Sequence, residues 1–268
     1  DVGSGKTMVA TAAVYAAAAG MMALALALLG AWMADGKQTV VLAPESVYTE
    51  YIDLAMLAGE FLLMGLIVAL SIRHRKYPVI LLSAGQTLLV AWSEIFHPVQ
   101  KSTHLRVDGL AMLLCIIAAF VGGFICIYAV GYMKAYHEHH KEYKDRSGFF
   151  FSMLFLFLAA MFGLVLSENL VWMYFFWEVT SVVSFLLIGY TRTEEAVNNS
   201  FRALWMNLLG GFGFAAAIVY MAWNYGVVQL AEVIAIAPAI PVALLAFAAL
   251  TKSAQLPFSS WLLGAMVA

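Results

Sequence analysis

Three ionisable residues, Glu60, Glu178 and Lys252, lie inside long apolar stretches of this sequence. A charge at membrane depth costs from about 3 to more than 10 kcal/mol, so each of these residues needs a partner, water or a function. Ionisable residues in such surroundings are typical of proton and ion paths. The chemistry that these three residues could perform is therefore the uptake and release of protons.

Glu178 is the deepest of the acidic residues. It lies eight residues into an apolar stretch, which is roughly 12 Å along a helix and close to the centre of a bilayer. Tyr174 and Ser181 stand four and three residues away, so they share its helix face and could hold water or relay a proton. The alternative is a neutral, hydrogen-bonded glutamate that only holds helices together.

Lys252 lies in the segment A-L-T-K-S-A-Q-L-P-F. Pro257 removes a backbone donor and clashes one turn back, at Ser253, which predicts a kinked or broken helix beside the lysine. Transporters place ion sites at helices broken near the midplane, where freed backbone groups share a cavity with water. The alternative is a lysine whose side chain extends to the inner membrane face.

The other polar residues in apolar stretches give weaker indications. Glu60 lacks polar companions at helical spacing, which favours a packing or lateral-contact role. Asn207 precedes Gly210 and Gly211, so it could bridge water between Glu178 and Lys252 or hold two helices together. Glu94 and Asp108, at the ends of apolar stretches, are expected at the membrane interface.

The elements that must position these residues are membrane helices. Of the 268 residues, 64% are hydrophobic and 11% are charged, against about 45–50% and about 25% in soluble domains, which excludes a soluble globular protein. The net charge of -2 disfavours nucleic acid as a partner. We expect a fragment of a longer chain, since the sequence starts with Asp1 and stops at Ala268 within an apolar stretch.

Apolar stretches long enough to span a bilayer occur eight times, at residues 8–33, 52–72, 78–95, 109–132, 148–166, 170–190, 201–222 and 240–262. The connectors between them are short, which predicts one membrane domain. If the N-terminus is inside, the outer side holds only Lys37, Lys101 and Arg106, and the inner side holds Lys6, Arg73, Arg75, Lys76, Lys134, Lys141, Lys144, Arg146, Arg192 and Arg202. This asymmetry predicts a cytoplasmic N-terminus.

Several patterns that are often associated with ligands carry little weight here. G-S-G-K-T at residues 3–7 lacks the earlier glycine of a phosphate-binding loop, so no nucleotide is expected. H-E-H-H at residues 137–140 is expected to be a solvated loop rather than a metal site. Cys115 and Cys126 are too few for an iron-sulfur cluster and are expected to pack as small hydrophobic residues.

Three stretches carry a family resemblance: R-V-D-G-L-A-M-L-L at 106–114, L-V-W-M-Y-F-F-W-E-V-T-S-V-V-S-F-L-L-I-G-Y at 170–190, and L-T-K-S-A-Q-L-P-F-S-S-W-L at 250–262. Together they resemble the antiporter-like proton-channel subunits shared by respiratory complex I, Mrp-type sodium/proton antiporters and energy-converting hydrogenases. The resemblance covers residues 106–268.

The resemblance implies an all-α, multi-pass transmembrane bundle with the antiporter-like fold. Residues 1–105 would be three N-terminal spans without an assigned transport role, and residues 106–268 would hold the first of two inverted repeats. It also implies that Glu178 and Lys252 are the coupled charges of a proton half-channel, with the helix broken at Pro257. Some complex I relatives carry an acid near the position of Asn207, so that relay step is uncertain here.

Departures from the pattern narrow the resemblance. After the lysine, complex I members usually read S-W-L-P-x-A-M, whereas this chain reads S-W-L-L-G-A-M-V-A, which is similar to subunits of membrane-bound nickel-iron hydrogenases and carbon-monoxide-linked hydrogenase complexes. This implies redox partner subunits that hold iron-sulfur and nickel-iron centres, with no cofactor in this chain.

The sequence therefore predicts a subunit of the cell membrane that moves protons or sodium ions, driven by redox chemistry in peripheral partners. Two other functions stay open. One is a stand-alone or Mrp-type sodium/proton antiporter subunit, and the other is a membrane anchor that transports nothing. The chain is not expected to hold a catalytic redox centre.

Overall fold

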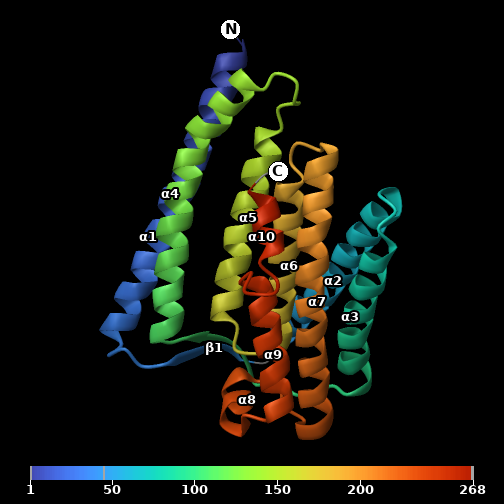
Figure 1. The fold of residues 1–268 in the computed structure, drawn as a ribbon. Helices are drawn as coiled ribbons and strands as arrows, with labels where there is room; N and C mark the ends of the chain where they lie inside the picture. Colours follow the sequence, from blue (N-terminus) through green and yellow to red (C-terminus); the bar gives the residue numbers. More distant parts are fainter. Residues whose placement is uncertain (1, 45, 267–268) are drawn as a thin grey trace. The chain divides into compact units, whose positions relative to one another are not determined.

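The computed structural model describes the backbone of residues 2–44 and 46–266 and the side chains of residues 9–42 and 46–266. Its elements (Figure 1) are, in chain order, α1 (Val2–Ala34), β1 (Val40–Pro44), α2 (Val47–Arg73), α3 (Tyr77–Phe96), β2 (Thr103–Val107), α4 (Gly109–His139), α5 (Ser147–Leu166), α6 (Leu170–Ile188), α7 (Glu194–Tyr225), α8 (Leu230–Ile236), α9 (Ala239–Lys252) and α10 (Ser260–Ala265). The fold is the expected all-α, multi-pass bundle, with one two-stranded sheet formed by β1 and β2.

Within the described residues, seven helices, α1 to α7, are long and apolar enough to cross a membrane. The eighth apolar stretch of the sequence is different, because it contains the 14-residue α9 and the 6-residue α10. The segment 3–7 lies outside the described side chains, so the expectation that it binds no nucleotide stays a prediction.

The chain forms two compact units: Asp1–Val40 with Arg106–Leu166 (unit 1), and Val41–Leu105 with Ser167–Ala268 (unit 2). The sequence suggested a different division of the helices, into residues 1–105 and residues 106–268. Two of the three N-terminal spans, α2 and α3, belong to unit 2, where they pack on α6 and α7. Two helices without an assigned transport role therefore pack against α6 and α7, and α6 carries Glu178.

In unit 1, α4 lies along α1 (Figure 1). It also contacts α5. Glycines allow the close approach of these helices. A Cβ on Gly122 would collide with the Leu158 side chain of α5, and one on Gly123 would collide with Met22 of α1. Both cysteines are buried, as predicted, and Cys126 belongs to a buried apolar cluster.

The H-E-H-H segment is not a loop over its whole length, because α4 continues to His139. Carboxylates lie beside two of its histidines: His137 Nε2 is 3.4 Å from Asp145 Oδ1, and His140 Nδ1 is 3.1 Å from Glu142 Oε1. Stacked aromatic rings of Tyr132 and Tyr136 extend the same helix face. The helix therefore runs beyond its apolar stretch into the charged connector.

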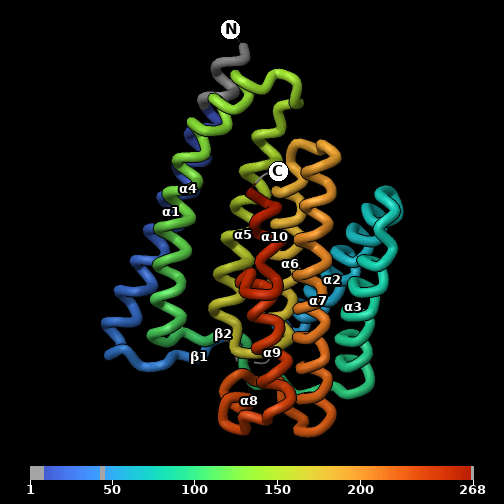
Figure 2. The backbone as a smooth tube through the Cα atoms, in the orientation of Figure 1, coloured from blue at the N-terminus to red at the C-terminus, as the bar shows by residue number. Residues whose placement is uncertain are grey.

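In unit 2, α7 packs against α3, α6, α9 and α10, and α2 packs against α3 and α6 (Figure 2). Side-chain hydrogen bonds cap the first turns of α6 and α7, the two most buried helices. Asn169 accepts a hydrogen bond from the Trp172 backbone N–H at 2.8 Å and starts α6, and Thr193 accepts one from Ala196 at 3.1 Å and starts α7. Gly226, in the left-handed region, ends α7.

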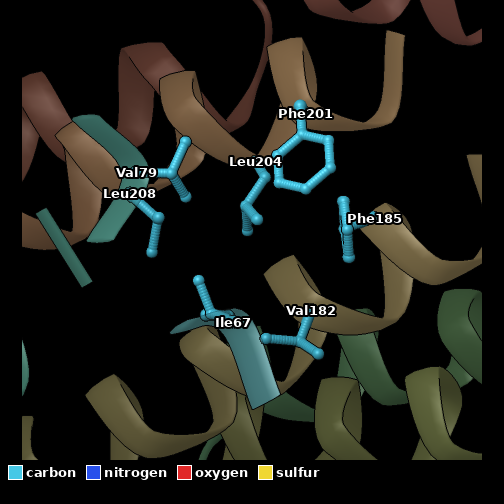
Figure 3. Close-up of a cluster of buried hydrophobic side chains, with 7 residues drawn as sticks. All are labelled: Ile67, Val79, Val182, Phe185, Phe201, Leu204 and Leu208. Carbon is cyan, nitrogen blue, oxygen red and sulfur yellow. The ribbon is translucent and has the colours of Figure 1, made fainter. Parts of the chain in front are cut away.

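A buried apolar cluster lies toward one end of this bundle (Figure 3). The cluster joins the C-terminal parts of α2 and α6 to the N-terminal parts of α3 and α7, and its residues are Ile67, Val79, Val182, Phe185, Phe201, Leu204 and Leu208. The rings of Phe185 and Phe201 meet edge to face, with centroids 5.0 Å apart. We call this group the apolar cluster.

The predicted break beside Lys252 is present. α9 ends at Lys252 with Ser253 as its C-cap, and α10 starts only at Ser260, so Pro257 lies in the connecting segment. Helix ends leave carbonyl groups without helical partners. One of them, the Thr251 carbonyl, accepts a hydrogen bond from the Trp261 indole at 3.0 Å. The end of α9 is thus fixed by a side chain from beyond the break.

Candidate functional site

Glu178 lies in the middle of α6 and is only 5% exposed. Its Oε2 accepts a hydrogen bond from Gln86 Nε2 of α3 at 2.6 Å. A short hydrogen bond to a carboxylate is among the stronger ones in proteins. An N-terminal span therefore supplies a direct partner to the central acid, which the sequence did not indicate.

Gly211 of α7 lies against this pair. A Cβ at Gly211 would be 2.6 Å from Glu178 Oε1 and 2.7 Å from Gln86 Oε1, distances that real Cβ atoms do not show. Both of these oxygens are buried and have no hydrogen-bond partner among the described residues. The absence of a side chain at Gly211 therefore allows the carboxyl and the amide to converge on the same part of α7.

Lys252 reaches α6 from the end of α9. Its Nζ donates to Ser181 Oγ at 2.7 Å and to the Trp177 carbonyl at 3.2 Å. The ammonium also lies 5.1 Å from the centre of the Trp177 ring, a cation–π distance. The side chain is therefore held on α6 and does not extend along α9 to a membrane face.

Ser181 connects the two charged residues. It lies one turn after Glu178 on α6, accepts the hydrogen bond of Lys252, and donates to the Trp177 carbonyl at 3.0 Å. In the part of the chain that the structure describes, no ion pair within 4 Å joins Glu178 directly to Lys252. The lysine is thus close to the acid without being locked to it.

The other candidate residues take different places. Tyr174 is fully buried beside Phe214, and its hydroxyl has no described hydrogen-bond partner. Asn207 Nδ2 donates to the Ala203 carbonyl of its own helix at 2.8 Å, and its buried Oδ1 has no hydrogen-bond partner among the described residues. The water bridge and the interhelical contact considered from the sequence stay predictions. Pro257 supports the break but does not contact the two charges in any described hydrogen bond.

A second set of charges lies where α2, α3 and the loop before β2 meet. Lys101 Nζ is 3.0 Å from Asp53 Oδ2 and 2.8 Å from Glu94 Oε1. The indole of Trp172 donates to Asp53 Oδ1 at 2.5 Å. We call Asp53, Glu94 and Lys101 the surface cluster. The expected place of Glu94 at a membrane interface stays a prediction.

The electrostatics of the surface cluster favour the charged lysine. Burial by itself would lower the pKa of Lys101, but the carboxylates of Glu94 and Asp53 together raise that pKa above the ordinary value of 10.5. A paired ammonium with two carboxylate partners is a stable arrangement at neutral pH.

Known proteins resemble most of this chain. Residues 167–268 match the family described as "NADH:quinone oxidoreductase/Mrp antiporter, TM", and residues 92–144 match "NADH-Ubiquinone oxidoreductase (complex I), chain 5 N-terminus". The chain belongs to the antiporter-like membrane subunit family. It is thus a multi-pass integral membrane protein, as its seven apolar helices also indicate.

Curated relatives of this antiporter-like chain include the protein named "Na(+)/H(+) antiporter subunit A1" of Staphylococcus haemolyticus, which is 34% identical over 69% of this chain and 23% of its own length. The protein of the same name from Staphylococcus aureus strain JH9 is 34% identical over 61% of this chain and 21% of its own length. The chain therefore spans less than a quarter of the length of these relatives.

Two solved structures share the fold of the antiporter-like chain. The structure of the Mrp complex from Dietzia sp. DQ12-45-1b matches with a TM-score of 0.53 and 26% identity, over 81% of this chain and 25% of that one. The structure of the membrane-bound sulfane sulfur reductase, an archaeal respiratory membrane complex, matches with a TM-score of 0.51 and 16% identity. This match covers 80% of this chain and 47% of that one. The second likeness concerns the fold alone.

Sequence reasoning selected Glu178, Ser181 and Lys252, which the structure brings together, but it missed Gln86, Gly211 and the surface cluster. Gln86 had a detectable signal, since it is an amide inside an apolar stretch and burial of an amide requires a partner. Gly211 was named only as one of the two glycines that follow Asn207. The surface cluster joins residues from separate segments, and spacing along the chain does not indicate such contacts.

Proposed function

We propose that this chain is part of an ion-translocating membrane subunit in which Glu178 and Lys252 form a proton path. The observation that carries the proposal is the hydrogen bond of 2.7 Å from Lys252 to Ser181, one turn from Glu178. A lysine held near a buried carboxyl by a neutral hydroxyl can respond to that carboxyl without being fixed by it. Ion-path residues in membranes have this character.

The proton step follows from this geometry. An ammonium at Lys252 is stabilised by the negative charge of Glu178, by the Ser181 hydroxyl and by the Trp177 ring. A change of charge in a neighbouring subunit would weaken or strengthen the attraction between Glu178 and Lys252. Lys252 would then release a proton to, or take one from, water at the break between α9 and α10.

The driving reaction belongs to the proposal as well. The resemblance found in the sequence favours a complex of the energy-converting hydrogenase or complex I type, with iron-sulfur and nickel-iron centres in partner subunits and with the N-terminus of this chain in the cytoplasm. The solved relatives are multi-subunit membrane complexes, which supports an assembly with further membrane subunits.

A second function has its own support. The curated relatives are named sodium/proton antiporter subunits, and an Mrp complex shares the fold. An Mrp-type antiporter would use the same two charges to exchange protons against sodium ions without a redox partner. These names support antiporter-type ion translocation at least as well as a hydrogenase complex.

The test is ion movement in vesicles that carry the full-length subunit in its assembled complex. Lys252→Met is compared with wild type while a dye reports internal pH, first with a redox donor and then with an imposed sodium gradient. We expect proton movement to fall to the background of empty vesicles in the variant, because methionine cannot carry the proton. Response to the donor indicates the redox-driven complex, and response to sodium alone indicates the antiporter.

Lys37→Met is the matched control, since Lys37 is an exposed lysine in the turn after α1. It should leave transport unchanged. Subunit content is measured in every preparation. If Lys252→Met complexes assemble and still move protons at the wild-type rate, the path is elsewhere and the anchoring function replaces this proposal.

A further inference from the structure

Glu60 is an acid that the proposed path does not use. It lies in the middle of α2 in unit 2 and is 4% exposed. Its neighbour Gly59 is pressed against Phe175 of α6, where a Cβ would lie 2.8 Å from the ring. Glu60 therefore belongs to the interior of the bundle and does not point toward lipid. A lateral contact with another subunit would need an exposed side chain, which Glu60 does not have.

The carboxyl of Glu60 is incompletely paired. Its Oε2 is buried and has no hydrogen-bond partner among the described residues. Burial of an unpaired polar atom is costly, so a purely structural acid would be expected to have a partner. Buried unpaired polar atoms are also where ordered water binds.

The helix that carries Glu60 packs against both α3, which carries Glu94, and α6, which carries Glu178. Glu60 interacts electrostatically with Glu94 and Lys101 of the surface cluster and with Glu178. Tyr174 of α6 interacts electrostatically with Glu60 and Glu178, but its buried hydroxyl forms no hydrogen bond with either acid. The unpaired atoms of these three residues are therefore where water would bind.

The helix geometry continues this series to the surface. Asp53 precedes Glu60 by seven residues on α2, which is two turns, roughly 10 Å, along the same helix face. A cavity of about 80 Å³ opens next to the cluster and is lined by Glu94 and Lys101. Water therefore has room beside Glu94 and Lys101, the two residues of the surface cluster with which Glu60 interacts.

We propose that Glu60 is a second proton-carrying carboxyl, which connects Glu178 to the membrane face that bears the surface cluster. The proposal rests on the proposed function and names a further step in it. A hydronium ion in the cavity passes a proton along a chain of water to the Glu60 carboxylate and becomes water. The Glu60 carboxyl then gives its proton to a water molecule beside its unpaired Oε2 while that water gives a proton to the Glu178 carboxylate, so the water ends unchanged.

The test compares Glu60→Gln and Glu60→Asp in the full-length subunit of the assembled complex. Glutamine keeps the size of the side chain and removes the proton carrier, whereas aspartate keeps the carrier. We expect transport to fall about 100-fold in Glu60→Gln, the scale of a lost proton-transfer group, and to stay measurable in Glu60→Asp. Glu232→Gln, an exposed acid of α8, is the matched control and should have no effect.

Wild-type transport in Glu60→Gln would overturn the inference. Lys252→Met is measured in parallel, so that failure of the inference is distinguished from failure of the proposed function: loss in Lys252→Met with no loss in Glu60→Gln removes only the role of Glu60. If Glu60→Gln complexes do not assemble, Glu60→Asp is compared with Glu60→Asn, which is equally short and lacks the carboxyl. Equal rates in that pair would also overturn the proposal.

Discussion

The two ends of the α2, α3, α6 and α7 bundle differ sharply in polarity. Toward the surface cluster, buried acids and a lysine follow one another, with a cavity beside Glu94 and Lys101. Toward the opposite end, the apolar cluster fills the space with aliphatic and aromatic side chains (Figure 3). Glu178 lies between the two ends. Glu178 therefore has ionisable groups on the side of the surface cluster and packed apolar side chains on the side of the apolar cluster.

This one-sided polarity has a physical basis. Packed apolar side chains leave no polar partners for water, so a proton has no group to move along. Such packing disfavours water among the side chains of the apolar cluster. In the proposed function, a proton that enters from the surface cluster would reach Glu178 and leave through Lys252, whose Nζ hydrogen-bonds Ser181 one turn from the acid.

The largest effect on stability is expected from Leu208→Ala, in the apolar cluster. Leu208 is fully buried, and removal of its side chain leaves a cavity that costs about 2–5 kcal/mol in well-packed proteins. Thermal unfolding of the purified complex in detergent measures the loss. Leu62→Ala is the control, because Leu62 is on the same helix as Ile67 but 70% exposed. Equal melting temperatures of the two variants would contradict a tightly packed end.

A smaller effect, on transport, is expected from Gln86→Leu. This change removes the donor that lies 2.6 Å from Glu178 Oε2. A hydrogen bond to a charged group contributes about 1.5–3 kcal/mol, so we expect transport to slow about tenfold or more, since 1.4 kcal/mol corresponds to a factor of ten. Proton uptake into vesicles measures the rate. Thr87→Val alters a neighbouring buried polar residue of α3 and should have little effect.

The smallest effect is expected from Lys101→Met, at high pH. The pKa of Lys101 is raised in the folded protein, so its ion pairs contribute stability that is fully present below the ordinary pKa of 10.5 and is lost as the pH rises through the raised value. The contribution of such a pair is about 1 kcal/mol. Melting temperatures are measured from neutral pH to above 10.5. As the pH rises above the raised pKa of Lys101, the wild type should lose this stability and the Lys101→Met variant should not. Melting temperatures that change in parallel with pH in both proteins would show that the ion pairs contribute nothing.

The sequence was sufficient for the features that depend on local chemistry. Apolar runs of membrane length predict the helices, and Pro257 predicts the end of α9 at Lys252, because a proline acts on the preceding turn. Glu178 and Lys252 were conspicuous since charges are rare in apolar stretches. Their roles in transport stay predictions.

The features that the sequence did not reveal depend on packing between distant segments. The contact between Gln86 and Glu178 joins residues 92 positions apart, and the pair of β1 and β2 joins segments on either side of two helices. The division of helices between the two units is of the same kind. Periodicity describes one helix at a time and says nothing about which neighbour covers its polar face.

The adjacent glycines of α7 give the site a mechanical property. Successive residues of a helix point about 100° apart, and here Gly210 lies against Thr251 of α9 while Gly211 lies against Glu178 and Gln86. Because neither position has a side chain, only the backbone of α7 separates α9 from Glu178 at this level of the bundle. A displacement of α9 would therefore meet the backbone of α7 at Gly210 with no side chain between them, one residue from the position that faces Glu178.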